Sequence, residues 1–159
     1  MNRPEPDVVL PFEDQAPLQP EYHDDFALWL RVQAELLLER KFELLDVDKL
    51  AEEVDSTGRN LHRELKSRLD VILIHLLKLK FQSDHRSRNW LGSLREQRKQ
   101  VARLLADSPS LKRHVVEYAE QEYQGAVASA ADETGMPAST FPPTNPFSDA
   151  QLLDPDYVP

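Results

Sequence analysis

Residues 69–79 have the sequence LDVILIHLLKL. Leucine, isoleucine and valine occupy most positions, so a helix through this stretch is apolar on nearly every side. A helix that is apolar all round is buried in the interior of a protein. The run is far too short to cross a bilayer, which needs about 20 consecutive apolar residues. We therefore expect residues 69–79 to form the central element of a soluble helical protein.

The apolar pattern continues towards the N-terminus and predicts one long second helix. Asp46 can cap its first N–H groups, and we expect its end near Phe81. Gly58 lies inside this helix, and a helical glycine costs about 1 kcal/mol relative to alanine. A break at residues 56–60 is therefore the alternative to one continuous helix. The apolar positions at helical spacing are Val47, Leu50, Val54, Leu61, Leu65, Leu69, Ile72, Leu76 and Leu79.

A first helix is predicted over about residues 24–40, before this long helix. Asp24 or Asp25 can cap it, and residues 41–45 form a short connection. No proline lies between Glu21 and Ser108, which permits uninterrupted helix, because proline breaks helix interiors. The predicted apolar stripe of the first helix consists of Phe26, Trp29, Leu30, Gln33, Leu36 and Leu37.

Two more helices are predicted after the long one. Ser87 can cap the third helix. Ser108 and Pro109 are typical of a cap and a first helical residue, so they predict the start of the fourth. Gly135 is expected to end it. The fold class is therefore all-α, a four-helix, mainly antiparallel bundle with a long second helix and proline-rich N- and C-terminal extensions.

Proline content predicts the domain organisation. Five of the 12 prolines lie in the first 20 residues. We expect residues 1–22 to be a flexible proline-rich arm and residues 23–136 to be the helical bundle. Residues 137–159 are a proline-rich extension that either packs on the bundle or trails from it. Within this extension, Ser148 and Gln151 can form a capping box for one short helical turn.

Several short motifs occur along the chain in a specific order. They are DDFALWL at residues 24–30, AEEV at 51–54, HLLK at 75–78, RSRNW at 86–90, QR at 97–98, SPSL at 108–111, ETG at 133–135 and LLDP at 152–155. In this succession the chain resembles the bacterial domain-of-unknown-function family twenty-nine. The resemblance implies an all-helical fold and carries no assigned activity or catalytic residue. Leu79 departs from the aromatic residue expected after HLLK.

The residue types present argue against a familiar enzyme. The chain has no cysteine and only 4 isolated glycines, which excludes thiol chemistry and glycine-rich phosphate loops. None of the 5 histidines lies three or four residues from another, so the sequence predicts no metal site. We expect no catalytic residue, no cofactor and no membrane partner. The N-terminus shows no secretory signal, and we expect a cytoplasmic protein.

Charge is distributed in three blocks. Residues 1–58 hold 15 acidic and 5 basic residues, residues 59–113 hold 5 acidic and 14 basic, and residues 114–159 hold 8 acidic and none basic. The basic block can neutralise phosphates, or the acidic first and fourth helices can neutralise it in part. The candidate binding residues of this basic face are Arg86, Arg88, Arg95, Lys99 and Arg103.

Three polar residues are candidates for a polar core or a site: His75, Glu53 and Gln97. His75 lies within the apolar run, where a general base and a structural histidine are both consistent with the pattern. The structural interpretation gives it a hydrogen bond to Glu52, Glu53, Gln97 or Tyr118. Gln97 falls on the apolar stripe of the third helix, where a half-buried amide commonly joins two helices.

These patterns leave the function unknown and support three hypotheses. The first is a non-enzymatic helical interaction module that binds a protein partner or further copies of itself. The alternative is binding of nucleic acid or another polyanion through the basic face of helices two and three. The third is an unrecognised hydrolase centred on His75.

Overall fold

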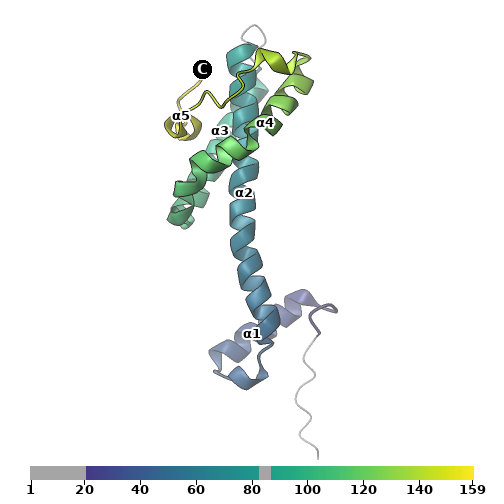
Figure 1. Ribbon diagram of the computed structural model, residues 1–159. Helices are drawn as coiled ribbons and strands as arrows, with labels where there is room; N and C mark the ends of the chain where they lie inside the picture. The colour runs from purple at the N-terminus through teal and green to yellow at the C-terminus, as the bar shows by residue number, and fades with distance from the viewer. Residues whose placement is uncertain (1–20, 83–86) are drawn as a thin grey trace, which may run out of the picture. The chain divides into compact units, whose positions relative to one another are not determined.

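The structure, a computed structural model, describes residues 21–82 and 87–159 (Figure 1). This part of the chain contains α-helices, 3-10 helices, turns and no strand, which confirms the all-α prediction. Its α-helices are α1 (Phe26–Leu38), α2 (Val47–Phe81), α3 (Arg88–Asp107), α4 (Val115–Thr134) and α5 (Asp149–Leu153). Its 3-10 helices are η1 (Phe42–Leu44), η3 (Pro109–His114) and η4 (Ala138–Thr140). No helix of the described chain is long and apolar enough to cross a membrane.

The described chain forms two compact units, residues 21–55 and residues 56–82 with 87–159, which we call the N-terminal and C-terminal units. In the described part of the N-terminal unit, the Asp25 carboxylate caps α1 by accepting a bond of 2.9 Å from the Leu28 amide. The side-chain Oε1 atom of Gln33 accepts a bond of 2.9 Å from the Asp46 backbone amide, which ties the start of α2 to α1. Trp29 is buried, and Tyr22 packs edge-on against its ring.

The helix α2 is continuous through Gly58, so the alternative break at residues 56–60 does not occur. A methyl group at Gly58 would meet nothing within 4 Å, so this glycine serves no close packing contact. Asp46 caps the helix through the Lys49 amide at 3.2 Å, as predicted. The helix also ends at Phe81, as predicted.

The core of the C-terminal unit is built around the apolar stretch of α2. Most of its side chains are fully buried, which confirms that residues 69–79 are the central element. The helices α3 and α4 pack against α2 in this unit (Figure 1). Their buried contributions include Leu94 and Val101 from α3 and Ala119 and Ala126 from α4.

The predicted helix ends are mostly confirmed. The Ser87 hydroxyl accepts from the Asn89 amide, Gly135 ends α4 with a φ of 71°, and Ser148 and Gln151 form the capping box of α5. The predicted start of the fourth helix is wrong, because a 3-10 helix precedes α4. Ser108 makes no side-chain cap; its amide closes α3 on the Leu104 carbonyl instead. The bond from the Leu111 amide to the Ser108 carbonyl then sets the tighter 3-10 winding.

Residues 137–159 pack on the C-terminal unit. Phe141, Phe147 and Leu152 are buried in its core. The Tyr123 hydroxyl also donates a bond of 2.7 Å to the Pro142 carbonyl. Nearly all of the predicted N-terminal arm lies outside the described residues, and the predicted division at residues 22 and 136 stays a prediction.

Candidate functional site

The predicted basic face is exposed along α3. Arg88 is its first residue and Arg95 follows seven residues later. Lys99 and Arg103 then follow Arg95 at intervals of four, and all four side chains are exposed. None of these four forms an ion pair with another described residue. Arg86 lies outside the described residues. The described part of the face is therefore not neutralised by the acidic α4.

Arg98 lies in the basic block of the sequence, but it is buried. It is 3% exposed, and its guanidinium donates three hydrogen bonds to backbone carbonyls of the C-terminal segment. The acceptors are Leu152 at 2.9 Å, Tyr157 at 2.7 Å and Gln151 at 2.5 Å. Burial lowers the pKa of Arg98, and the nearby Asp154 carboxylate opposes that shift. Arg98 is thus a structural residue that joins α3 to the C-terminal segment.

Gln97 and Glu53 each bond a residue other than His75. The Arg68 guanidinium of α2 donates a bond of 3.1 Å to the Gln97 side-chain oxygen, so Gln97 joins α3 to α2. Glu53 belongs to the N-terminal unit, where it accepts a hydrogen bond from the Tyr22 hydroxyl. That bond raises the pKa of Tyr22, because it stabilises the protonated hydroxyl.

The hydrogen bond predicted for His75 is not formed. Its Nδ1 atom is buried and has no hydrogen-bond partner. Tyr118, one of the predicted partners, bonds His62 instead. Burial lowers the pKa of His75, the charge of Lys78 lowers it further, and Glu133 opposes both effects. His75 Nδ1 is therefore a buried polar atom without the hydrogen bond that such an atom usually has.

Sequence reasoning missed the burial of Lys78. Its side chain is 2% exposed and forms an ion pair with Glu133 of α4. The Lys78 Nζ atom also lies 4.4 Å from the centroid of the Trp90 ring, a cation–π contact between α2 and α3. The sequence feature that indicated this burial is the position of Lys78, a single lysine inside the apolar run of residues 69–79. Its partners come from distant parts of the chain, so the sequence alone did not identify them.

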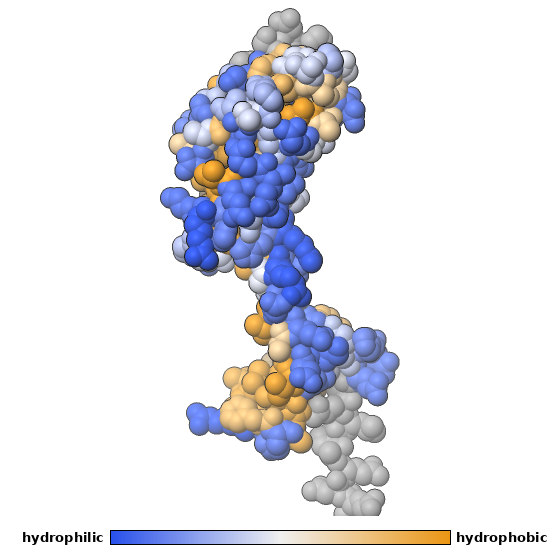
Figure 2. Space-filling model, viewed as in Figure 1, coloured by the Kyte–Doolittle hydropathy of each residue, from blue (hydrophilic) through white to orange (hydrophobic). Residues whose placement is uncertain are grey.

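The N-terminal unit exposes a large apolar surface (Figure 2). The predicted stripe of α1 is only half buried: Trp29 and Leu36 are buried, while Phe26, Leu30 and Leu37 are 39–46% exposed. The physical reason is size, because so small a unit offers too few partners to cover every apolar face. We call the exposed set the N-terminal apolar surface; it consists of Phe26, Leu30, Leu37, Leu38, Phe42, Leu44, Val47 and Val54.

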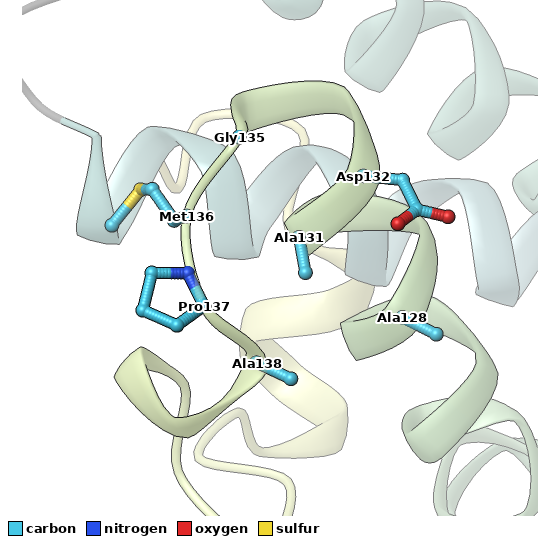
Figure 3. A pocket seen from close by; sticks show the side chains of 7 residues that line it. All are labelled: Ala128, Ala131, Asp132, Gly135, Met136, Pro137 and Ala138. Carbon is cyan, nitrogen blue, oxygen red and sulfur yellow. The ribbon is translucent and has the colours of Figure 1, made fainter.

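A separate hollow lies where α4 ends and η4 begins (Figure 3). Small and apolar side chains line most of it, and Asp132 is the one charged residue among them. The hollow is lined by Ala128, Ala131, Asp132, Gly135, Met136, Pro137 and Ala138.

Three comparisons with known proteins add one finding. A family model described as "Domain of unknown function DUF29" matches residues 21–158, which confirms the resemblance drawn from the motifs. The comparison with curated proteins and the comparison with solved structures found no match.

Proposed function

The chain belongs to the DUF29 family, whose description assigns no activity, and we propose a function from its own surfaces. It is a helical interaction module that binds a basic, amphipathic segment of a partner protein on the N-terminal apolar surface. The proposal assigns no catalytic residue, cofactor or metal. The cytoplasmic location expected from the sequence is part of the same proposal.

The observation that carries the proposal is the concentration of exposed apolar side chains in the N-terminal unit. Within residues 21–82 and 87–159, eight of the ten exposed large hydrophobic residues lie there, and Val116 and Val158 are the two in the C-terminal unit. Leu38 is 84% exposed and Val54 is 74% exposed. Single exposed apolar side chains are ordinary, but contiguous apolar patches on a monomer mark interaction sites.

The charge around this surface indicates the chemistry of the partner. Residues 21–55 hold 11 acidic and 4 basic residues. Three of the basic residues are already paired within the unit, as Arg31–Glu35, Lys41–Glu39 and Lys49–Glu52. The surface therefore combines apolar area with excess negative charge, and a complementary partner combines apolar side chains with lysine or arginine.

A second copy of the chain fits this surface less well than such a partner. Two N-terminal units would bring like charges together, which opposes their association. The α3 face of a second copy carries the opposite charge, but its exposed side is polar, because the apolar side of α3 is buried. Neither surface of a second copy matches both the apolar and the acidic character of the N-terminal unit.

Calorimetric titration with a synthetic leucine–lysine peptide of amphipathic helical pattern tests the proposal. We expect the full chain to bind it and to bind the matching leucine–glutamate peptide at least tenfold more weakly. The double variant Leu38→Ser/Phe42→Ser should lose at least tenfold in affinity for the lysine peptide. Each exposed side chain that becomes buried on binding contributes about 1.5–3 kcal/mol, and 1.4 kcal/mol is tenfold.

The matched control is Val116→Ser, which removes an exposed apolar side chain from the C-terminal unit and should leave binding unchanged. Equal affinity for the two peptides, or equal affinity of the wild type and the double variant, would refute the proposal. Light scattering after size exclusion completes the test. A wild-type dimer that the double variant converts to a monomer would assign the surface to a second copy instead.

A second candidate function is polyanion binding through α3. The observation that favours it is the exposed row of Arg88, Arg95, Lys99 and Arg103, none paired with another described residue. Arrays of this kind neutralise phosphates, and their affinity falls steeply as salt increases. Changing all four to glutamine should abolish binding of labelled single-stranded DNA measured by fluorescence polarisation at low salt. Unchanged binding by that variant would eliminate this candidate.

A further inference from the structure

A shallow basic hollow lies between α2 and α4 in the C-terminal unit. It has a volume of about 320 Å³ and is lined by Arg59, His62, Arg63, Lys66 and Tyr118. The four α2 residues are spaced at i, i+3, i+4 and i+7, so they share one face of the helix. Tyr118 comes from α4, so two elements line the hollow. No lining residue is a carboxylate.

Two of the cationic side chains in the hollow lack an acidic partner among the described residues. The Arg63 guanidinium donates a bond of 3.2 Å to the Asn60 side chain, which is neutral. The Lys66 Nζ atom lies 4.6 Å from the centroid of the Tyr118 ring, so an aromatic face holds it in place of a carboxylate. Both positive charges thus remain available to an anion.

The aromatic wall of the hollow is held in place by its neighbours. The His62 Nδ1 atom and the Tyr118 hydroxyl are hydrogen bonded at 2.7 Å. The His114 ring stacks on Tyr118 at 5.2 Å between centroids and meets His62 edge-on at 5.3 Å. Glu117 bonds His114 and Gln121 and does not line the hollow. Because Nδ1 of His62 is engaged, Nε2 is the atom of this ring that remains for a ligand.

From this arrangement we propose that the hollow binds a phosphate group. Guanidinium, ammonium and imidazole donors together match an oxyanion that carries more than one negative charge and several acceptor oxygens. The volume is at the small end of the range of about 300–1,000 Å³ found for ligand sites, which suits one or two phosphates. The group is either free inorganic phosphate or the phosphate of a small organic monoester. This site is separate from the N-terminal apolar surface and from the α3 face.

Calorimetric titration of the full chain with inorganic pyrophosphate tests the proposal directly. We expect saturable binding that Arg63→Gln/Lys66→Gln weakens at least tenfold, because each substitution removes a charge-assisted contact. Inorganic phosphate and glucose 6-phosphate are titrated in parallel. Tighter binding of the sugar phosphate assigns the site to an organic monoester, and tighter binding of inorganic phosphate assigns it to the free anion.

The matched control is Arg95→Gln/Lys99→Gln, which removes the same charge from the exposed face of α3. It should bind pyrophosphate as the wild type does. If it loses as much affinity as the hollow variant, the effect is general electrostatic attraction and the site does not exist. Failure of the wild type to bind any of the three anions at low salt would likewise overturn the proposal. Arg63 is exposed and Lys66 is partly exposed, so we expect the thermal unfolding midpoint of both variants to match the wild type.

Discussion

The guanidinium of Arg98 holds the C-terminal segment on α3. Three backbone carbonyls accept its hydrogen bonds, and two of them, Gln151 and Leu152, belong to α5. Carbonyls at a helix C-terminus carry partial negative charge, so a buried cation there is stabilised by the helix that it holds. Arg98 thus compensates the partial negative charge of these carbonyls and also attaches the C-terminal segment to α3.

Arg98→Met should destabilise the C-terminal unit by about 2–4 kcal/mol, because it leaves buried carbonyls without their charged donor. Urea unfolding in a Trp29→Phe background measures this, because Trp90 is then the one tryptophan and lies in the C-terminal unit. Arg95→Met at the exposed face is the control and should stay within about 0.5 kcal/mol of the wild type. Equal urea midpoints for the two variants would show that the guanidinium does not anchor the segment.

His75 should make the C-terminal unit sensitive to acid. Its pKa in the folded chain lies below the ordinary value of 6.5, so the unfolded chain takes up the proton more readily. The contribution of neutral His75 to the free energy of unfolding is therefore fully present above about pH 6.5. It is lost as the pH falls below that value towards and through the pKa of His75 in the folded chain. Lys78 and Glu133 are the charged groups that act on this ring.

His75→Leu should reduce the loss of stability between about pH 6.5 and about pH 5, because it removes the titrating ring. It also removes the buried, unpartnered Nδ1 atom, so stability at neutral pH should be retained or slightly raised. Urea midpoints at about pH 7.5 and about pH 5 compare the two proteins. Parallel pH profiles for wild type and variant would contradict this account of His75.

At the scale of the elements, α1 ends in a Schellman motif that lacks the usual glycine. The Lys41 amide bonds the Leu36 carbonyl at 2.9 Å, and the Arg40 amide bonds the Leu37 carbonyl at 3.2 Å. Arg40 has a φ of 59°, the left-handed conformation that costs a residue with a Cβ about 1–2 kcal/mol. Gly135 occupies the equivalent position after α4 with a φ of 71°.

Arg40→Gly should therefore stabilise the N-terminal unit by about 0.5–1 kcal/mol, the gain in the folded state being partly offset by greater freedom in the unfolded chain. Urea unfolding in a Trp90→Phe background reports on this unit through Trp29. Gly135→Ala is the converse change and should destabilise the C-terminal unit by a similar amount. If Arg40→Gly lowers stability, the backbone strain at Arg40 is not the dominant effect.

For the molecule as a whole, the sign of the charge distinguishes the N-terminal apolar surface from the two proposed anion-binding surfaces, the α3 face and the hollow. The N-terminal unit joins apolar side chains to excess negative charge, while α2 and α3 of the C-terminal unit carry exposed cations. Among the described residues, Lys78–Glu133 is the ion pair that links the basic block to α4. In the described chain, the acidic α4 therefore forms no ion pair with Arg95, Lys99 or Arg103 of α3, nor with Arg63 or Lys66 of the hollow.

The sequence by itself determined the all-α class, the continuous second helix and most helix ends. Those features depend on residues a few positions apart: Asp25 with Leu28, Asp46 with Lys49, and Ser148 with Gln151. It also indicated the central element, because a stretch that is apolar on every side is buried whatever packs against it.

Only the tertiary structure decided which side chains of each helix are covered. Arg98 and Lys78 are buried although their residue type predicts exposure, because α5 and α4 bring carbonyls and a carboxylate to them. Phe26 and Leu37 are exposed although their spacing predicts burial, because no described segment covers them. The burial and the pairing of a side chain depend on residues far apart along the chain. The spacing of apolar residues within one helix therefore does not predict them.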